Sequence, residues 1–443
     1  MQQSEILEKK HTIIYLSFLV VVGLGIRLYY FPYDVPIATD GYYSFVYSIK
    51  TVFDGSLAIG YDTTNSGWSN FLSLVFYFFD KSDPLYLMEI QRISSIMFSC
   101  LTIIPGFFIF KRFTNTKIAL VGSLILAVEP RLLLNSLEGI NFSMFFFLFV
   151  LSTALFLNRK KMTTYLAFVC VSLLSLTRYE GILLFIPFTI IFLRNSTKKE
   201  IIFKVFMITL IITTIIIPIS FLRMDATIEN CYEILNKEIC GKDGILNSFF
   251  DRTSSMNDKI QGIPDLDDEI YYDNNNMIEK FVFYSIANFI KFSALLLIPI
   301  FIFFFILTII SIKKNNFLKE RLDLLILFFI TFVMIIPSFY AYGRDISEIR
   351  YVLMIIPLAI TFSTFGINYF SNIGKNKKII IPILSLIIIL SFIHIEENQR
   401  DSKHDYESFI VSQKVIQLTE STNTFKSNGY IKTAILFSDW PNL

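Results

Sequence analysis

Arginine and carboxylate side chains stand next to several apolar runs of this sequence. Asp40 lies in IATDGYYSF, directly after the first run, and Arg178 and Glu180 share SLTRYEGILLF. Arg344 and Arg350 stand in GRDISEIR, directly before another run. Arginine grips phosphate oxygens with paired hydrogen-bond donors. These residue types therefore suit an anionic lipid headgroup that is held beside a carboxylate.

Each of these residues also has a purely structural explanation. Arg and Glu near helix ends often extend to the lipid headgroups, and Arg178 and Glu180 could simply pair with each other. Asp40 could cap a helix, which is worth roughly 1 kcal/mol. The joint pattern favours a site, because ionisable residues at membrane depth are costly. Other charged residues near the same helix ends are Arg27, Arg92, Glu129, Arg131, Glu138, Asp345 and Glu348.

The composition shows that membrane helices must position these residues. Hydrophobic residues make up 54% of the 443 residues and charged residues only 17%, with a mean hydropathy of +0.58. The net charge of +2 gives no indication of a nucleic-acid partner. Apolar runs of about 18 or more residues predict an all-α polytopic membrane protein. Eleven candidate spans lie at about 12–30, 90–110, 117–135, 139–157, 162–177, 181–193, 201–222, 281–311, 322–341, 350–370 and 378–395.

Clusters of lysine and arginine predict which side of the membrane each connection faces. The apolar run at 68–79 is shorter than the ~17 residues that a span needs, so we expect a re-entrant or interfacial helix there. With eleven spans, the positive-inside rule places the N-terminus inside, and the C-terminus and the candidate site outside. The basic inner connections are 111–117, 158–162, 194–200, 312–321 and 374–378.

One membrane domain, residues 1–395, is expected to carry the whole site. Its first outer loop, 31–89, contains segment 42–54, with Asp40 at the N-terminal edge. Apolar and aromatic residues recur in this segment at a helical spacing, with Ser, Thr and Lys between them. This amphipathic pattern predicts a helix in the plane of the membrane interface.

A second outer loop and a short tail complete the expected outer face. Loop 223–279 has thirteen Asp and Glu against five Lys and Arg, and we expect it to cover the acceptor side of the site. Its Cys231 and Cys240 could form a disulfide in an oxidising compartment. Residues 396–443 are expected to form a short extracytoplasmic tail that contains one strand.

Several short motifs follow one another in order along residues 10–395. DGYY follows the first span, RISS lies in a span that ends in KRF, and PRLLLNSLE, LTRYEGILL and RYVLMIIP come later. This order resembles the GT-C superfamily of polyprenyl-phosphate-sugar-dependent glycosyltransferases. The likeness is to the group that contains protein mannosyltransferases, aminoarabinose transferases of lipid A and bacterial arabinofuranosyltransferases. It implies a GT-C-type helix bundle with the site at its outer face.

The resemblance also implies roles for single residues. In this superfamily an acid of the first outer loop acts on the acceptor hydroxyl as a general base, or orients it, and Asp40 has that position here. Many relatives have a second acid next to it, where this sequence has Gly41. Whether Asp34, Asp62 or Glu138 assists stays open. The residues then expected to bind the donor and acceptor are Tyr42, Tyr43, Trp68, Arg92, Glu138, Arg178, Glu180, Arg344 and Arg350.

The resemblance implies an enzyme that needs no cofactor. Metal-dependent relatives such as oligosaccharyltransferases use acidic pairs with the spacing DxD, whereas this sequence has DKSD at 80–83. Arginines could then stabilise the leaving phosphate without a metal. A divalent metal is the less favoured alternative.

The implied function is inverting transfer of one hexose or pentose from a polyprenyl (dolichyl) phosphate. The acceptor hydroxyl would belong to a glycan, a lipid or a protein on the extracytoplasmic face. A flippase or another transporter of lipid-linked saccharides is the first alternative, which predicts internal repeats and charges near the bilayer midplane. No repeat is visible in the sequence. A non-catalytic assembly subunit is the second alternative, and it would tolerate the loss of Asp40.

Overall fold

The structure, a computed structural model, describes most of the predicted membrane domain. It describes residues 2–37, 40–55, 66–194, 196–224, 277–297, 322–343, 348–372, 380–398 and 406–412, with the single residues 301, 309, 346 and 414. Arg344, the cysteines Cys231 and Cys240, and the strand predicted near the C-terminus lie outside the described residues.

Every regular element of the described residues is a helix, which confirms the all-α polytopic membrane fold. The first helix, α1 (Gln2–Tyr29), is followed by two short helices, α2 (Asp40–Asp54) and α3 (Ser66–Phe76). The others are α4 (Pro84–Leu101), α5 (Ile103–Phe113), α6 (Thr116–Val128), α7 (Pro130–Leu137), α8 (Phe142–Leu157), α9 (Lys161–Thr177), η2 (Tyr179–Leu184), α10 (Phe185–Leu193), α11 (Lys198–Met224), α14 (Met277–Leu297), α16 (Leu322–Gly343), η5 (Ile349–Ile355), α17 (Ile356–Asn372) and α18 (Ile380–Asn398).

Not all of these helices have the length of a span. Among the described residues, five stretches are long and apolar enough to cross a membrane, and α6 and α7 meet that test only together, with a bend of 44° between them. Each of the eleven predicted runs overlaps a helix, and the count of eleven spans stays a prediction. The five are Lys10–Tyr29, Pro84–Phe113, Lys198–Pro218, Leu322–Gly343 and Ile349–Asn368.

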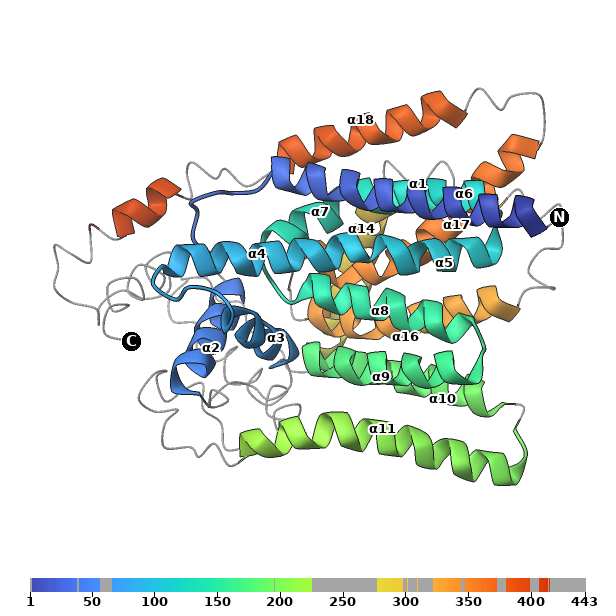
Figure 1. The fold of residues 1–443 in the computed structure, drawn as a ribbon, viewed down its shortest axis with the longest axis horizontal. Helices are drawn as coiled ribbons and strands as arrows, with labels where there is room; N and C mark the ends of the chain where they lie inside the picture. Colours follow the sequence, from blue (N-terminus) through green and yellow to red (C-terminus); the bar gives the residue numbers. More distant parts are fainter. Residues whose placement is uncertain are drawn as a thin grey trace.

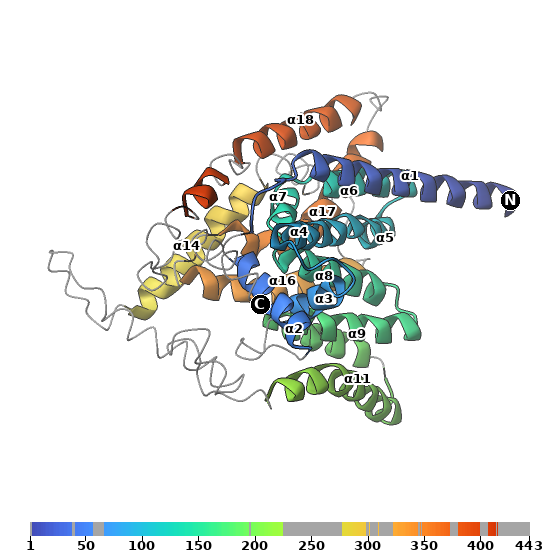
Figure 2. The same cartoon turned by 60° about the vertical axis from the view of Figure 1, so that its left-hand side comes forward.

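The longer helices lie roughly side by side and form a bundle (Figure 1). The outer helices α18 and α11 flank this bundle on opposite sides, in Figure 1 and again in Figure 2. Connections 111–117 and 158–162, both basic, lie at the end of the bundle where the N-terminus lies, and α2 and α3 lie at the opposite end (Figure 1). The bundle therefore separates the basic connections from the first loop, in the way that the charge pattern predicts.

The helix predicted at 42–54 forms as α2 and packs against protein. Phe45 and Ile49 of α2 are buried in one apolar cluster with Trp68 and Leu72 of α3. At 11 residues, α3 is shorter than the ~17 residues that a span needs. The apolar side of α2, which the pattern alone assigns to the lipid interface, thus covers α3 and the start of α4.

A cluster of phenylalanines holds the middle of the bundle together. Phe149 of α8, Phe168 of α9 and Phe188 of α10 are fully buried in the largest apolar core. The rings of Phe156 and Phe188 stack at 4.1 Å between centroids. Because lipid is as apolar as these side chains, close packing rather than exclusion from water stabilises such helix contacts.

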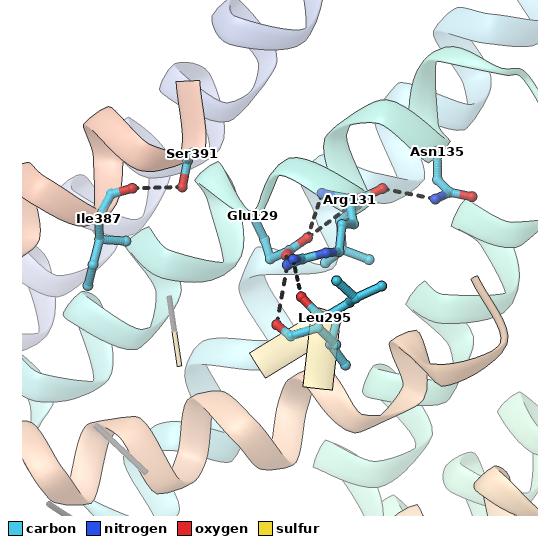
Figure 3. Close-up of polar contacts among 8 residues, drawn as sticks. Glu129, Arg131, Asn135, Leu295, Ile387 and Ser391 are labelled. Carbon is cyan, nitrogen blue, oxygen red and sulfur yellow. Dashed lines mark hydrogen bonds and ion pairs between the residues drawn. The ribbon is translucent and has the colours of Figure 1, made fainter. Parts of the chain in front are cut away.

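Glu129 and Arg131, two charged residues of the α6–α7 break, satisfy helix ends inside the bundle. The carboxylate of Glu129 accepts from the backbone N–H groups of Arg131 and Leu132 at 2.8 and 2.9 Å, and so caps α7. Arg131 pairs with Glu129 at 2.8 Å and also donates to the carbonyls of Leu295 and Leu296 in the last turn of α14 (Figure 3). A cation at a helix C-terminus is favourable. The structure thus gives this pair a structural role.

Candidate active site

Asp40 forms an ion pair with Arg350 at the end of the bundle opposite the N-terminus. Asp40 is the first residue of α2, and its Oδ2 lies 2.8 Å from Nη2 of Arg350, in the first turn of η5. The Nε of Arg350 also pairs with the carboxylate of Glu348. The fold thus places the acid that precedes segment 42–54 directly beside one of the predicted phosphate-binding arginines.

Arg178 and Glu180 form the second ion pair of the site. Arg178 follows the last residue of α9, and its Nη2 and Nε donate to the two carboxylate oxygens of Glu180 at 2.8 and 3.3 Å. Burial disfavours the charge of Arg178, but the Glu180 carboxylate outweighs burial and raises the pKa of Arg178 above its ordinary value. Arg178 and Glu180 therefore do pair with each other, as the structural explanation of the sequence proposes.

Gly181 allows the turn after Arg178 to pack closely on α9. A Cβ at this position would lie 2.8 Å from the carbonyl carbon of Leu174 and from the backbone nitrogen of Ser175. Such contacts with backbone atoms are shorter than van der Waals distances, so only glycine fits without a shift. The local sequence RYEG thereby fixes how Arg178 and Glu180 point into the bundle.

One pocket joins the two ion pairs. Arg178, Glu180 and Arg350 line it, and its volume is about 20 Å³. That volume accommodates about one or two water molecules, so a sugar phosphate needs side-chain movement to enter. The other lining residues are Phe142, Phe145, Met334, Pro337, Ser338, Tyr351 and Met354.

The ring of Tyr351 lies near both arginines. The guanidinium carbons of Arg178 and Arg350 are 5.8 and 5.7 Å from the centroid of its ring, and Arg178 also lies 5.5 Å from the ring centroid of Phe145. Both distances to Tyr351 are within the range of cation–π attraction. The ring therefore contributes a favourable contact to each of these two like charges.

Gln91 of α4 and Trp68 of α3 anchor the start of α2. The side-chain amide of Gln91 donates to the carbonyls of Gly41 and Gly139 at 2.9 and 2.8 Å, and Nε1 of Trp68 donates to Gly139 at 3.2 Å. Gly139 has a φ of +70°, which favours glycine. These bonds hold Gly41, the neighbour of Asp40, close to the α7–α8 turn. The indole N–H of Trp68 is used by a backbone carbonyl of the protein.

Arg92 likewise donates to the backbone. Its Nε bonds to the carbonyl of Leu137 at 3.1 Å, Nη2 bonds to that of Pro36 at 3.2 Å, and Nη1 bonds to that of Val35. Its exposed fraction is only 5%. The structure thus places Arg92 under the first loop, where it joins this loop to the end of α7, and we propose that it positions the site.

The other predicted site residues lie around the start of α2. Tyr42 and Tyr43 are half-buried, and their rings meet edge to face at 5.8 Å. Glu138 is exposed, and its carbonyl lies 3.1 Å from where a Cβ on Gly41 would stand. The structure therefore places Tyr42, Tyr43 and Glu138 around the start of α2, and none of the three lines the pocket.

The structure adds residues that the sequence does not single out as binding residues. Glu348 pairs with Arg350, the Tyr351 ring lies near both arginines, and Gln91 anchors α2. The sequence signals for the first two are that Glu348 is a charged residue near a helix end and that Tyr351 directly follows Arg350. Gln91 stands next to Arg92, but its residue type does not indicate a contact with α2. Only the fold shows what it contacts.

The described part of the chain holds no group of three or more His, Cys, Asp or Glu side chains that could bind a metal ion. Asp80 and Asp83, the acids of DKSD, bond within their own loop instead. Asp80 accepts from Ser82, and Asp83 caps α4 through the N–H of Leu85 at 2.8 Å. The metal-free site expected from the sequence stays a prediction.

Comparison with known proteins identifies the fold. No protein-family model and no curated protein sequence matches the chain. The oligosaccharyltransferase of Archaeoglobus fulgidus in its apo form superposes with a TM-score of 0.52 at 10% identity, over 96% of this chain and 59% of that chain. The same enzyme in complex with zinc and sulfate gives a TM-score of 0.51 at 12% identity, over 92% and 56% of the two chains.

The chain has a GT-C fold. The fold that the sequence motifs imply is thereby confirmed. The chain spans somewhat more than half the length of the oligosaccharyltransferase structures that it matches. Within this GT-C fold, the ion pairs of Asp40 and Arg178 lie at the end of the bundle that carries the first loop.

Proposed function

We propose that this protein is a membrane glycosyltransferase that moves one sugar from a polyprenyl phosphate to an acceptor hydroxyl. The observation that carries the proposal is the contact between Asp40 and Arg350, next to a second arginine, at one end of a GT-C bundle. A base and a phosphate-binding cation are the two groups that such a transfer requires. The site supplies both from α2 and η5.

In the proposed reaction, Asp40 takes the proton of the acceptor hydroxyl as its oxygen attacks the anomeric carbon of the sugar. The bond between this carbon and the phosphate oxygen breaks, and the phosphate leaves with the bonding electrons. A single displacement of this kind inverts the anomeric configuration and needs no covalent intermediate. Arg350 and Arg178 stabilise the negative charge that develops on the leaving phosphate.

We place the reaction at the extracytoplasmic face of the cell membrane. The basic connections 111–117 and 158–162 lie at the opposite end of the bundle, which the positive-inside rule assigns to the cytoplasm. The donor is then a polyprenyl-phosphate sugar in the outer leaflet, and the acceptor is a glycan, lipid or protein exposed on that face.

The role of the cation is assigned to the arginines rather than to a metal. The oligosaccharyltransferase of similar fold was solved with zinc and sulfate, so a divalent ion is the alternative to test. Transfer by the purified protein should persist in EDTA. A rate that EDTA abolishes and Mg²⁺, Mn²⁺ or Zn²⁺ restores would overturn the assignment.

A transfer assay tests the proposal as a whole. Purified full-length protein is incubated with radiolabelled polyprenyl-phosphate hexoses and pentoses and with membrane extracts as acceptors. We expect one donor to be consumed and its label to appear in an acceptor product. Transport of the intact lipid-linked sugar across proteoliposomes, with no bond cleaved, would instead favour a flippase.

A further inference from the structure

Among the described residues of the two ion pairs, carboxylates outnumber guanidinium groups. Three carboxylates, Asp40, Glu180 and Glu348, pair with two guanidinium groups, those of Arg178 and Arg350. Each guanidinium has a carboxylate partner within the protein. A phosphate that enters this site therefore meets a carboxylate at both cations, and binds well only where one carboxylate gives way.

Burial distinguishes the two ion pairs. Glu180 has an exposed side-chain fraction of 8% and engages two nitrogens of Arg178, so its removal would leave a charge unpaired inside the protein. Asp40 and Glu348 are 61% and 47% exposed, whereas their partner Arg350 is 18% exposed. Exposed carboxylates turn into water at little cost. Arg350 is thus the arginine whose partner can change.

We propose that the phosphate of the donor displaces Asp40 from Arg350, so that donor binding releases the carboxylate that transfer requires. This exchange rests on the function proposed above. The ion pair between Nη2 and Oδ2 uses one corner of the guanidinium, while a phosphate can accept two parallel hydrogen bonds from it. The phosphate is therefore the stronger partner.

The exchange has a chemical consequence for Asp40. While its Oδ2 is paired with Nη2 of Arg350, this oxygen is engaged and does not face a hydroxyl. Once the phosphate has taken Arg350, the oxygen is open to accept the proton of the acceptor. The donor has then to bind before the acceptor hydroxyl is activated.

Tyr351 helps to hold the Arg350 guanidinium in place during the exchange. The guanidinium carbons of Arg350 and Arg178 lie 5.7 and 5.8 Å from the centroid of its ring. This contact does not depend on either carboxylate. Arg350 can therefore stay in the pocket while Asp40 turns away from it.

Phosphate affinity measures the exchange directly. The full-length protein in detergent micelles is titrated with farnesyl monophosphate, and with farnesol as the uncharged control. Asp40→Asn removes the competing carboxylate, so we expect it to tighten farnesyl phosphate binding about two- to fivefold, with farnesol binding unchanged. Asp54→Asn, at the exposed end of the same helix, is the matched control and should bind like the wild type.

Two further variants distinguish the loss of a competing carboxylate from an effect of the substitution on folding. Glu348→Gln should also tighten binding, since it removes the other carboxylate of Arg350. In an Arg350→Gln background, Asp40→Asn should bring no gain, because the shared cation is gone. Unchanged or weaker phosphate binding in both Asp40→Asn and Glu348→Gln, or a gain that persists without Arg350, would overturn the exchange.

The transfer assay separates this inference from the proposed function. Loss of transfer in Asp40→Asn without tighter phosphate binding would contradict the exchange and leave Asp40 as the base. Tighter binding with full transfer would contradict the role of Asp40 as the base and leave the exchange standing.

Discussion

Arg178 and Glu180 depend on each other inside the protein, and single substitutions there act on both folding and binding. Glu180 accepts both donors of the guanidinium and has little exposure. A charged carboxylate without its partner at such a position destabilises a protein strongly. The binding role of Arg178 therefore has to be measured in a variant that leaves no unpaired charge.

Arg178→Met should destabilise the protein on the order of 3 kcal/mol, because it strands the Glu180 carboxylate. Arg178→Met combined with Glu180→Leu should regain most of that stability. Both variants should bind farnesyl phosphate more weakly than the wild type. Thermal unfolding in detergent and titration with the probe give the two readouts. Wild-type affinity in the double variant would reduce Arg178 to a structural residue.

The residue types in the sequence predict the chemistry of the site better than they predict which side chains pair with each other. The sequence indicates that Asp40, Arg178 and Arg350 belong to one face, because each adjoins the outer end of an apolar run. The partner of each depends on helix packing, which the sequence does not show. Arg92 illustrates this: its type suits a phosphate, whereas in the fold three backbone carbonyls use its donors.

At the scale of elements, short turns and helix ends position the charged groups. The α7–α8 turn at Gly139 accepts from Gln91 and Trp68, and the turn at Gly181 places Arg178 and Glu180. Helical periodicity predicts α2 and its start well. It does not predict that α3 rather than lipid covers the apolar side, since both surfaces are apolar.

Gly181→Ala tests how closely η2 packs on α9. The added methyl group would meet backbone atoms of Leu174 and Ser175 at 2.8 Å. We expect a destabilisation of about 1–3 kcal/mol and weaker farnesyl phosphate binding, as Arg178 moves with the turn. Gly25→Ala in α1, where no atom lies within 4 Å of the new Cβ, is the control and should be neutral or stabilising. Equal behaviour of the two variants would contradict the packing argument.

Gln91→Leu tests the anchor of α2. The substitution removes the two hydrogen bonds to the buried carbonyls of Gly41 and Gly139, which should cost about 2 kcal/mol. The start of α2 should exchange its amide hydrogens faster, and transfer should fall while farnesyl phosphate still binds. Unchanged amide exchange in α2 would show that other contacts suffice to fix it.

At the scale of the whole molecule, the charge pattern along the sequence predicts the ends of the bundle. The basic connections 111–117 and 158–162 lie at the same end as the N-terminus, and α2 and α3 lie at the other end. Five stretches of the described residues are long and apolar enough to span a membrane alone. The number of apolar runs in the sequence does not settle the number of spans, because some runs are broken, as at Glu129–Pro130, and others form helices that are short.

Cysteine labelling tests the proposed orientation of the bundle. In a background without the native cysteines, a cysteine in place of Asp54 should react with a membrane-impermeant maleimide added outside intact cells. A cysteine in place of Lys160, in connection 158–162, should react only after the cells are opened. Labelling of both positions from the same side would contradict the proposed topology.

The transfer rate of Asp40→Asn tests the central claim most directly. Purified wild type, Asp40→Asn and Asp54→Asn are compared with the same labelled polyprenyl-phosphate sugar and acceptor. If Asp40 is the general base, its substitution should lower the transfer rate at least about 100-fold, with normal expression and thermal stability, while Asp54→Asn transfers at the wild-type rate. Transfer by Asp40→Asn at close to the wild-type rate would contradict the assignment of this carboxylate as the base.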